Sequence, residues 1–595
     1  MLKSVCATVG LIAITAGADS IRGQNQPTAP LIGIWASENS IGPVLKGELV
    51  VTRNGSDWRA HIGTLSTAFR ANGDSVRFSL GNELGRFRGS IGGSAITGWW
   101  IQPPGVVLGN AMATPLTIRQ TSPGVWRGQV VPAEDKYTLF LIVSRTDAGS
   151  LTAAFRNPQL NHRDGASFLN VSRVGDTVLF TARPDTSQPE IRHRALFDSA
   201  GQQLTLYWPE LGRTLVLTPR REDQAIELFG RLPRGQRQPY SAPTATNDGW
   251  KVAAARSVGF DEEKLRALVQ RIADTLPMPR RAPFIHSLLV ARHGKLVLEE
   301  YFAGYDRDVV HDTRSAAKTF ASVMLGAAML QGSPIAPETP VARLLSFEFP
   351  VANPDPRKER ITVAHLMTHS SGLACDDNEN DSPGNENTLQ SQTSQPDWWK
   401  YMLDLPMSYE PGTHYAYCSG GSNLVGGAVR AATKTWLPEF FDRSIARPLD
   451  FGRYYYNLQP TLEGYTGGGV LMRPRDLLKI GQLYLNGGVW NGKRIVSQSW
   501  VDVSTAKQME WPYQNENVSA GRDGFAWHLN SLKSSNGHVY REYEANGNGG
   551  QLLMVLPELD MVVVFTAGNF QGGGVWGRFR DDLVPNAIIP AIEAR

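Results

Sequence analysis

The chain contains 595 residues, which is more than one hydrophobic core can organise, because single cores stop growing at roughly 250–300 residues. At least two domains are therefore expected. Lys and Arg total 59 against 56 for Asp and Glu. The basic residues are scattered and form no stripe that could follow a phosphate backbone, so the composition predicts no nucleic-acid partner.

Residues 1–18 have the pattern of a secretory signal peptide. Lys3 precedes an apolar run over 5–15, and 16–18 supply the small residues of a cleavage site. A core helix is the alternative, but the run leads directly into a polar segment. The run is too short to span a bilayer, and no later segment approaches the length of a transmembrane helix. We therefore expect a secreted or periplasmic protein without a transmembrane segment, whose mature chain begins near Asp19.

Two cysteines remain once the signal peptide has removed Cys6. Disulfides persist in exported proteins, so Cys375 and Cys418 are expected to form one. Two buried free thiols are the alternative, and the distance between them cannot be derived from the sequence.

Residues 30–235 have the pattern of an all-β domain. Short apolar runs such as 47–53 and 176–182 are separated by Gly, Asn, Asp and Pro, without a convincing helical period. Features recur in the same order roughly a hundred residues apart, which suggests an internal duplication. The matching pairs are Ile34-Trp35 with Val125-Trp126, 49–53 with 141–145, 74–78 with 176–180 and, more loosely, 96–100 with 204–208. The expected architecture is a lipocalin-like antiparallel barrel or a sandwich.

Residues 236–250 are polar, rich in proline and free of periodic apolar residues, which predicts a linker. The remainder, 251–595, mixes strands and helices. Asp261 caps a predicted helix that ends near Asp274, and 285–301 reads as a hairpin that turns at His293-Gly294. A second hairpin over 551–566 precedes a final helix. Strands at both ends with helices between them predict an α+β domain whose antiparallel sheet combines the two ends and is flanked by helices.

Two Ser-x-x-Lys sequences compete for a catalytic interpretation. Ser315 and Lys318 begin an apolar helix, where residues three apart share a face and partial burial would lower the pKa of the lysine towards that of a base. A capped structural helix is the alternative. Ser504 and Lys507 are followed by no apolar helix, so that pair is expected to be a solvated helix end.

Three further segments accompany Ser315: His-Ser-Ser-Gly-Leu at 369–373, Pro-Gly with Tyr-Cys-Ser over 411–419, and Asn-Gly-Asn-Gly-Gly-Gln at 546–551. With these segments in this order, residues from about 249 onwards resemble the serine β-lactamase and penicillin-binding-protein superfamily, specifically its class C β-lactamase-like esterases and amide hydrolases. The resemblance implies a β-lactamase/transpeptidase-like fold for the C-terminal domain.

By position, the resemblance makes Ser315 the nucleophile, Lys318 a proton relay and Tyr417 the general base and acid. It makes the backbone N–H groups of Ser315 and Gln551 an oxyanion hole. The alternatives are that Gly547 to Gly550 form a simple bulge or tight turn and that Tyr417 is a core residue. Two departures matter. Ser419 stands where Asn is usual, and Asn548-Gly549-Gly550 replaces Lys/His-x-Gly in the expected substrate-binding strand. Loss of that cation removes a partner for a substrate carboxylate and favours an esterase or amidase over a β-lactamase.

Other chemistries have weaker signals. His365 and His369 lie four apart, but no glutamate or third ligand accompanies them, so a structural pair is expected. No Gly-x-Ser-x-Gly elbow or nucleotide-binding glycine motif occurs, so cofactor-free hydrolysis of a small-molecule or peptide-like ester or amide is predicted. The alternatives are a β-lactamase or D-Ala peptidase acting on β-lactams or peptidoglycan, and a catalytically weak penicillin-recognising binding protein.

Overall fold

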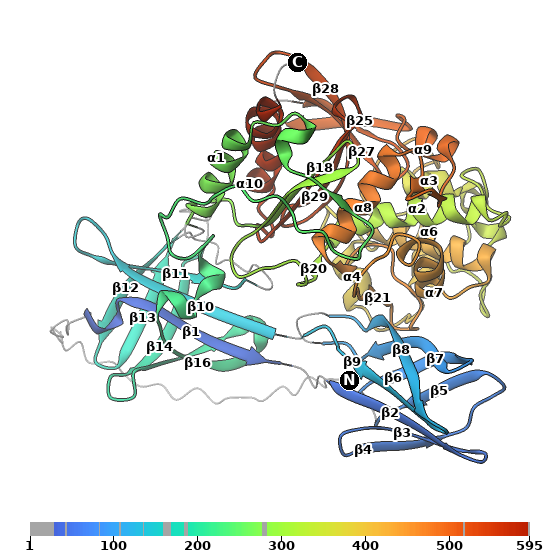
Figure 1. Ribbon diagram of the computed structural model, residues 1–595, viewed down its shortest axis with the longest axis horizontal. Helices are drawn as coiled ribbons and strands as arrows, with labels where there is room; N and C mark the ends of the chain where they lie inside the picture. Colours follow the sequence, from blue (N-terminus) through green and yellow to red (C-terminus); the bar gives the residue numbers. More distant parts are fainter. Residues whose placement is uncertain are drawn as a thin grey trace.

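The computed structural model describes residues 29–592 except 42–44, 82–83, 106–108, 135, 159–167, 184–188, 277–281 and 516–517. The predicted signal peptide, residues 1–18, lies outside the described residues. Figure 1 shows two β bodies beside a larger domain of mixed helices and strands, in agreement with the predicted all-β and α+β parts. Among the helices described, none is long and apolar enough to cross a membrane.

The first β body is a sheet in the order β4-β3-β2-β9-β8-β7-β6-β5. Every neighbouring pair is antiparallel, and alternate side chains on its strands form one core. The strands are β2 (Gly47–Asn54), β3 (Asp57–Ile62), β4 (Leu65–Phe69), β5 (Ser75–Ser79), β6 (Arg86–Gly92), β7 (Ala95–Gln102), β8 (Met112–Ser122) and β9 (Val125–Val130).

The second β body is a closed eight-stranded antiparallel barrel, as the lipocalin-like pattern predicted. Its interior is packed with side chains, and the Trp208 indole donates to the hydroxyl of Tyr137 across that core. The strands, in barrel order, are β1 (Gly33–Ser40), β10 (Lys136–Arg145), β11 (Leu151–Arg156), β12 (Leu169–Val174), β13 (Thr177–Ala182), β14 (Ile191–Asp198), β15 (Gln203–Trp208) and β16 (Arg213–Arg220).

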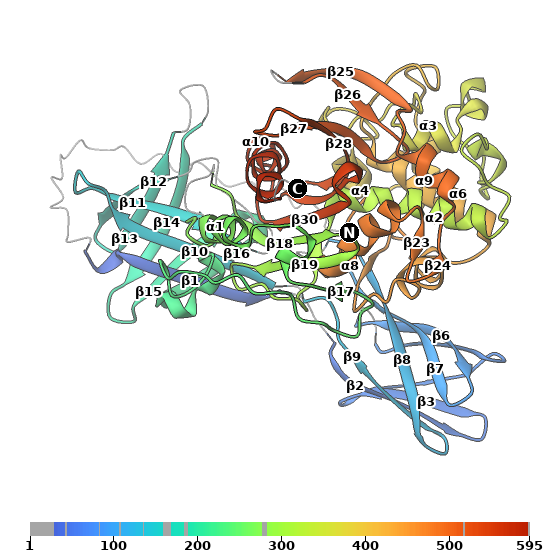
Figure 2. The same cartoon turned by 45° about the horizontal axis from the view of Figure 1, so that its top comes forward.

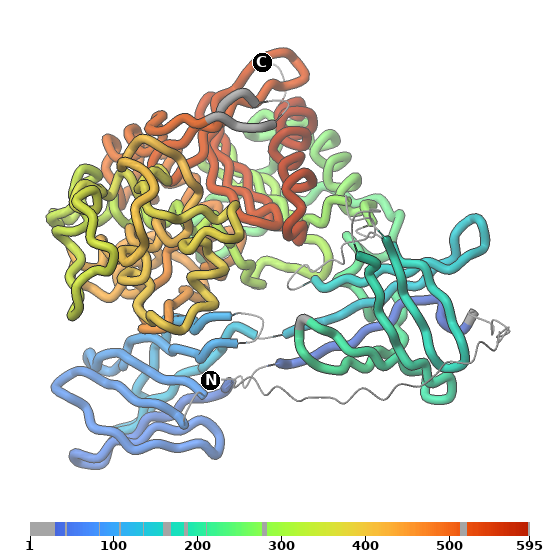
Figure 3. The backbone as a smooth tube through the Cα atoms, turned by 180° about the vertical axis from the view of Figure 1, so that it is seen from behind, coloured from blue at the N-terminus to red at the C-terminus, as the bar shows by residue number. Residues whose placement is uncertain are grey.

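The predicted duplication corresponds to strands β1–β8 and β9–β16, and each repeat gives its first strand to the other. β1 pairs with β10 and β16 and so closes the barrel of the second repeat. β9 pairs with β2 and β8 and so completes the sheet of the first. The echoed Trp35 and Trp126 lie on these two exchanged strands. The two β bodies, side by side in Figure 3, are therefore tied together by their own strand pairing.

The third sheet, at the centre of the C-terminal domain, joins both ends of that domain. Its order is β17 (Lys251–Val252), β19 (Lys295–Tyr301), β18 (Ile285–Arg292), β30 (Met561–Ala567), β29 (Gln551–Leu556), β28 (Val539–Gly547), β27 (His528–Lys533), β26 (Val518–Asp523) and β25 (Met509–Asn515). Both predicted hairpins are present, and β18 pairs with β30. Only the β17–β19 pair is parallel.

Both faces of this sheet are covered, because successive apolar residues on its strands point to opposite sides. Leu552 and Met554 pack with α1 (Glu262–Ala273) and the C-terminal helices, whereas Leu553 and Val555 face α8 (Pro474–Leu485) and the helical layer. Figure 2 shows these two layers on either side of the sheet. The other helices are α2 (Lys318–Leu330), α3 (Val363–Met367), α4 (Glu386–Ser391), α5 (Trp398–Asp404), α6 (Ser419–Thr433), α7 (Leu437–Phe441), α9 (Gln498–Ser504) and α10 (Gly573–Arg578), which continues as a wider helical turn over Phe579–Ile588.

The predicted linker contains no helix or strand, yet it is attached to the C-terminal domain. Arg475, fully buried, pairs with Asp248 at 2.9 Å and with Glu299 at 2.8 Å, and its guanidinium also donates to the carbonyl of Thr244. The Tyr240 hydroxyl donates to the carbonyl of Val297. These bonds fix the connection between the β bodies and the C-terminal domain.

The first β body docks directly on the C-terminal domain. The short strand β21 (Tyr456–Asn457) pairs antiparallel with β8, and Trp99 packs edge-on against Trp436 with ring centroids 5.4 Å apart. Arg88 lies over the same Trp436 ring. Trp99 is therefore an interface residue, whereas Trp100 belongs to the sheet's own core.

Candidate active site

Ser315 lies in a single tight turn, Arg314–Ala317, that leads into α2. Arg314 has a φ of 49°, a left-handed conformation that costs an ordinary residue roughly 1 kcal/mol or more. Its N–H donates to Asp312 and its carbonyl accepts from Gly469. The helix beyond is buried almost throughout, so the turn is held against the domain core and Ser315 lies at a helix start whose first N–H groups lack partners within the helix.

Lys318 reaches the serine as the three-residue spacing predicted. Its Nζ lies 3.0 Å from Ser315 Oγ and donates to the carbonyl of Gly467 at 2.6 Å. Burial alone would lower the pKa of Lys318, but Tyr417, Glu386 and Asp377 outweigh it and the pKa is raised. The predicted lowering was therefore wrong, because the effect of burial is outweighed by Tyr417 together with two carboxylates that the sequence did not place beside the amine. Lys318 is a buried cation at neutral pH.

Tyr417 approaches the same amine from the segment before α6. Lys318 Nζ lies 4.9 Å from the centroid of its ring. On the other side the ring packs against His369 at 4.6 Å, and the His369 backbone and ring accept hydrogen bonds from the N–H groups of Ala416 and Cys418. Burial is the main cause that lowers the pKa of His369 to about 3, so its neutral ring fixes the position of Tyr417 without a charge.

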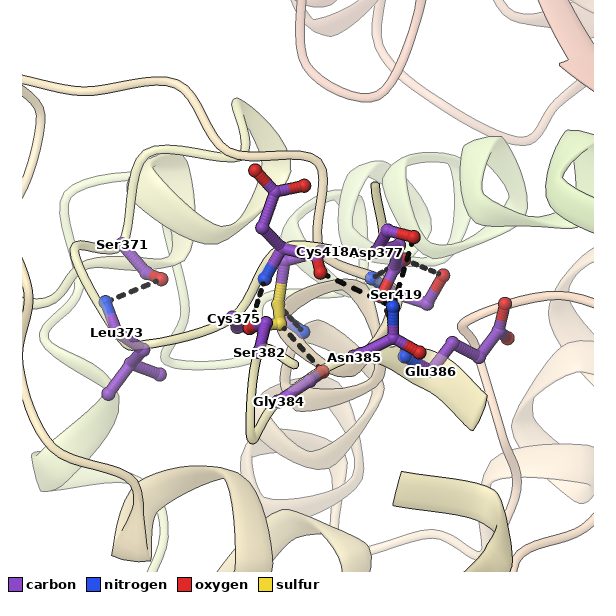
Figure 4. The surroundings of a disulfide bond; sticks show 12 residues. Ser371, Leu373, Cys375, Asp377, Ser382, Gly384, Asn385, Glu386, Cys418 and Ser419 are labelled. Atoms are coloured by element: carbon purple, nitrogen blue, oxygen red, sulfur yellow. Dashed lines mark hydrogen bonds between the residues drawn. A yellow bond between two sulfur atoms is a disulfide. The ribbon is translucent and has the colours of Figure 1, made fainter. Parts of the chain in front are cut away.

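The predicted disulfide between Cys375 and Cys418 is present, with Cα atoms 5.6 Å apart. It joins the loop before α4 to the start of α6 (Figure 4). Beside it, the backbone N–H and the hydroxyl of Ser419 donate to Asp377 at 2.8 and 2.6 Å. The N–H of Asp377 donates in turn to the carbonyl of Tyr417. The disulfide thus connects two segments that flank Lys318.

Ser419, for which a substrate-binding role was predicted, does not line the catalytic cavity in the described structure. The side chain is fully buried, and the hydroxyl is occupied by Asp377, which itself lines the catalytic cavity. Burial raises the pKa of Asp377, partly offset by Lys318. Ser419 therefore holds Asp377, which comes from another segment, at the edge of the cavity.

The end of β28 packs against the serine turn. A Cβ on Gly547 would lie 2.3 Å from the carbonyl oxygen of Thr313 and 3.1 Å from the N of Ala316, so only glycine permits this approach. Beyond Glu544 the outer edge of β28 has no paired strand in the described part of the chain. Gly547 therefore packs directly against the turn that carries Ser315. The second oxyanion donor stays a prediction, with the N–H of Gln551 and the backbone of residues 546–548 as the candidates.

The other predicted residues of this strand have different positions. Asn548, Gly549 and Gln551 line the cavity. The Asn548 amide oxygen accepts from the N–H of Gln571, and the Gln551 side chain is occupied by hydrogen bonds with Ala567. Gly550 has a φ of 99° and lies under Trp576, where a Cβ would clash. Gly550 does not line the cavity in the described structure, and its substrate-binding role stays a prediction.

The competing Ser504 and Lys507 do not converge. The hydroxyl of Ser504 donates back to the carbonyl of Trp500 at the end of α9 and is fully buried, whereas Lys507 is exposed and pairs with Glu510 at 2.9 Å. The pair lies at a helix end as predicted, although only the lysine is solvated.

His365 and His369 have separate partners. His365 Nδ1 accepts from the N–H of Thr362 in the cap of α3, while His369 supports Tyr417. Within the described residues, no group of three or more His, Cys, Asp or Glu side chains could hold a metal ion.

Ser315 and Tyr417 line one large cavity of about 1070 Å³. Much of its wall was not predicted from the sequence. Asp377 and Glu386 lie about sixty to seventy residues after Ser315 in the chain and belong to no spacing pattern. The nearby Cys375 was the only signal in the sequence. The N-terminal β bodies also line this cavity through several residues, among them Met112, Val131, Ala133 and Glu134.

The C-terminal part of the chain is similar to known proteins. Residues 286–575 match the family model described as Beta-lactamase. The 6-aminohexanoate-dimer hydrolase of Paenarthrobacter ureafaciens is 24% identical over 261 residues, covering 40% of this chain. The match spans 61% of that relative's length, which is less than two thirds.

Two solved structures match part of this chain. A putative 6-aminohexanoate-dimer hydrolase from Bacillus anthracis has a TM-score of 0.41 and 19% identity over 57% of this chain and 84% of its own. A family VIII carboxylesterase has a TM-score of 0.38 and 20% identity over 48% of this chain and 86% of its own. Both TM-scores lie below 0.5, so neither likeness bears on function.

Proposed function

Because residues 286–575 belong to the β-lactamase family, we propose that the chain is an exported serine hydrolase that cleaves ester or amide bonds through an acyl-enzyme on Ser315. The observation that carries the proposal is the 3.0 Å contact between Lys318 Nζ and Ser315 Oγ, in a buried site beside Tyr417. A serine hydroxyl needs a nearby base and a positive charge before it can attack a carbonyl, and this site offers both.

The raised pKa of Lys318 gives Lys318 and Tyr417 different roles in the reaction. As a cation, Lys318 stabilises negative charge on the oxygens of Tyr417 and Ser315, so Tyr417 accepts the serine proton as Ser315 Oγ bonds to the carbonyl carbon. Tyr417 then gives that proton to the leaving alcohol or amine as the bond to the acyl group breaks. In the second half of the reaction, water attacks the acyl-enzyme by the same proton transfers. The acyl group leaves as a carboxylic acid, and Ser315 regains its proton.

The developing oxyanion needs donors placed in advance. One is the N–H of Ser315 at the start of its helical turn, and the other comes from the backbone of residues 546–548, supported by the contact of Gly547 with that turn. Both donors are backbone groups, so the hole tolerates the change from Lys/His-x-Gly to Asn548-Gly549-Gly550. The same change leaves no cation on this strand to pair with a substrate carboxylate.

Substrate hydrolysis by matched serine variants tests the proposal. The panel is p-nitrophenyl butyrate, a chromogenic β-lactam, a D-alanine amide and the 6-aminohexanoate dimer named for the curated relative. Ser315→Ala is expected to lower kcat by about 10³-fold or more on every substrate that the wild type cleaves. Ser504→Ala, from the second Ser-x-x-Lys sequence, is expected to retain activity. Equal activity in wild type and Ser315→Ala would reject Ser315 as the nucleophile.

A further inference from the structure

The catalytic cavity has a wall that does not belong to the C-terminal domain. Met112 at the start of β8 and Val131, Pro132 and Ala133 after β9 line the same cavity as Ser315. These residues come from the first β body and from the segment that leads into the barrel. The β bodies are therefore part of the space that a substrate must enter.

This wall is held in place from both domains. Gln102, buried at the end of β7, forms two hydrogen bonds with the backbone of Ala133. Its Oε1 accepts from the Ala133 N–H at 2.7 Å, and its Nε2 donates to the Ala133 carbonyl at 3.2 Å. From the C-terminal domain, the Tyr455 hydroxyl donates to the carbonyl of Val131 at 3.0 Å. These hydrogen bonds fix the shape of the wall.

Register pairing places the wall beside the catalytic residues. Met112 lies opposite Asn457 in the β8–β21 pair, and the Asn457 amide donates to the carbonyl of Gly468. The neighbouring Gly467 supplies the carbonyl that accepts from Lys318. The lining of the cavity is thus continuous from the first β body to the buried amine.

The chemistry of the junction is apolar. Met112 and Ala133 form one cluster with Tyr455 and Leu471, and Val310 packs against it. All five residues line the cavity. Charged side chains from the β bodies that line it, Lys46, Glu134 and Lys136, are exposed.

We infer that this junction, formed by Met112 and residues 131–133 with Tyr455 and Leu471, is a specificity site for the elongated aliphatic acyl chain of the ester or amide attacked by Ser315. The inference rests on the proposed function and names its substrate class. The Met112 side chain limits the length of the acyl chain that fits, because an apolar pocket discriminates between substrates by the number of methylene groups it can hold.

Two opposed substitutions test the inference in the full-length protein. Met112→Ala shortens a lining side chain without changing the backbone pairing of β8, and Ala133→Leu fills the same junction. The readout is kcat/KM for p-nitrophenyl decanoate divided by kcat/KM for p-nitrophenyl butyrate. We expect Met112→Ala to raise this ratio and Ala133→Leu to lower it, each by about tenfold or more.

Leu116→Ala is the matched control, since Leu116 lies on the same strand but in the core of the first β body and away from the cavity. Its ratio should equal that of the wild type. Ratios that stay unchanged in Met112→Ala and Ala133→Leu, while Ser315→Ala abolishes hydrolysis, would overturn the specificity site and leave the proposed function standing. Wild-type protein that cleaves neither ester, or cleavage that survives in Ser315→Ala, would overturn both.

Discussion

Removal of the disulfide should weaken both the stability of the C-terminal domain and its catalysis. The bridge joins positions separated by 43 residues. For a loop of that length, the chain-entropy expression gives about 13 cal/mol/K, or about 4 kcal/mol at 25 °C, as the contribution to the free energy of unfolding. Cys375→Ser combined with Cys418→Ser is therefore expected to lower the stability of this domain by about 2–4 kcal/mol.

The effect on catalysis has a separate origin. Cys418 follows Tyr417 directly, and Asp377 lies two residues after Cys375 with its N–H bonded to the Tyr417 carbonyl at 2.8 Å. Without the bridge, both segments gain freedom, and Tyr417 is less often beside Lys318. At a temperature where the variant remains folded, kcat should therefore fall while KM changes less.

Urea unfolding and ester hydrolysis measure these two effects in the double variant. Wild type reduced with dithiothreitol provides a second sample, in which alkylation and intact mass verify that both thiols are free. The reasoning is refuted if fully reduced protein keeps the stability and kcat of the oxidised protein. A change in stability alone would refute only the link between the bridge and Tyr417.

Three other outcomes follow from the site. Lys318→Met should lower kcat by about 10²–10⁴-fold in a folded protein, measured with p-nitrophenyl butyrate, and activity within a few-fold of wild type would contradict the role of the amine. Gly547→Ala should lower both activity and thermal stability, since its Cβ would meet the Thr313 carbonyl at 2.3 Å; unaltered kinetics would show that β28 does not contact the serine turn. Burial lowers the pKa of His369 to about 3 in the folded protein. Between that pH and about 6.5, this histidine therefore binds a proton more readily in the unfolded chain than in the folded one. The free energy of unfolding should accordingly fall as the pH drops through this window. Urea titrations at several pH values should show a shallower decline for His369→Asn, and an identical decline would contradict the assignment.

The sequence predicted those parts of the fold that depend on local pattern. Alternation and turn residues identified the β bodies, and the echoed Trp35 and Trp126 identified the repeat. The exchange of β1 and β9 between the two β bodies could not be predicted, because the two strands share the Ile-Trp and Val-Trp pattern and a pattern of this kind does not specify which sheet a strand joins. Only the paired registers distinguish the two arrangements.

In the candidate site, too, the features that depend on local spacing could be predicted and those that depend on tertiary packing could not. The approach of Lys318 to Ser315 follows from helical geometry, so three residues of spacing were enough to predict it. The raised pKa of Lys318 depends first on Tyr417 and then on Glu386 and Asp377, and these two carboxylates reach the site through tertiary packing and the disulfide. Likewise, no pattern within 31–237 indicates that Met112 borders the catalytic cavity, because that depends on how two domains dock.

The most direct test of the account is covalent labelling of the nucleophile. Native protein is treated with a fluorophosphonate, digested and analysed by mass spectrometry, with Ser315→Ala treated in parallel. The account predicts one phosphonylated peptide, modified on Ser315, and no labelling of the variant. A phosphonate attached to another residue, or equal labelling of Ser315→Ala, would contradict it.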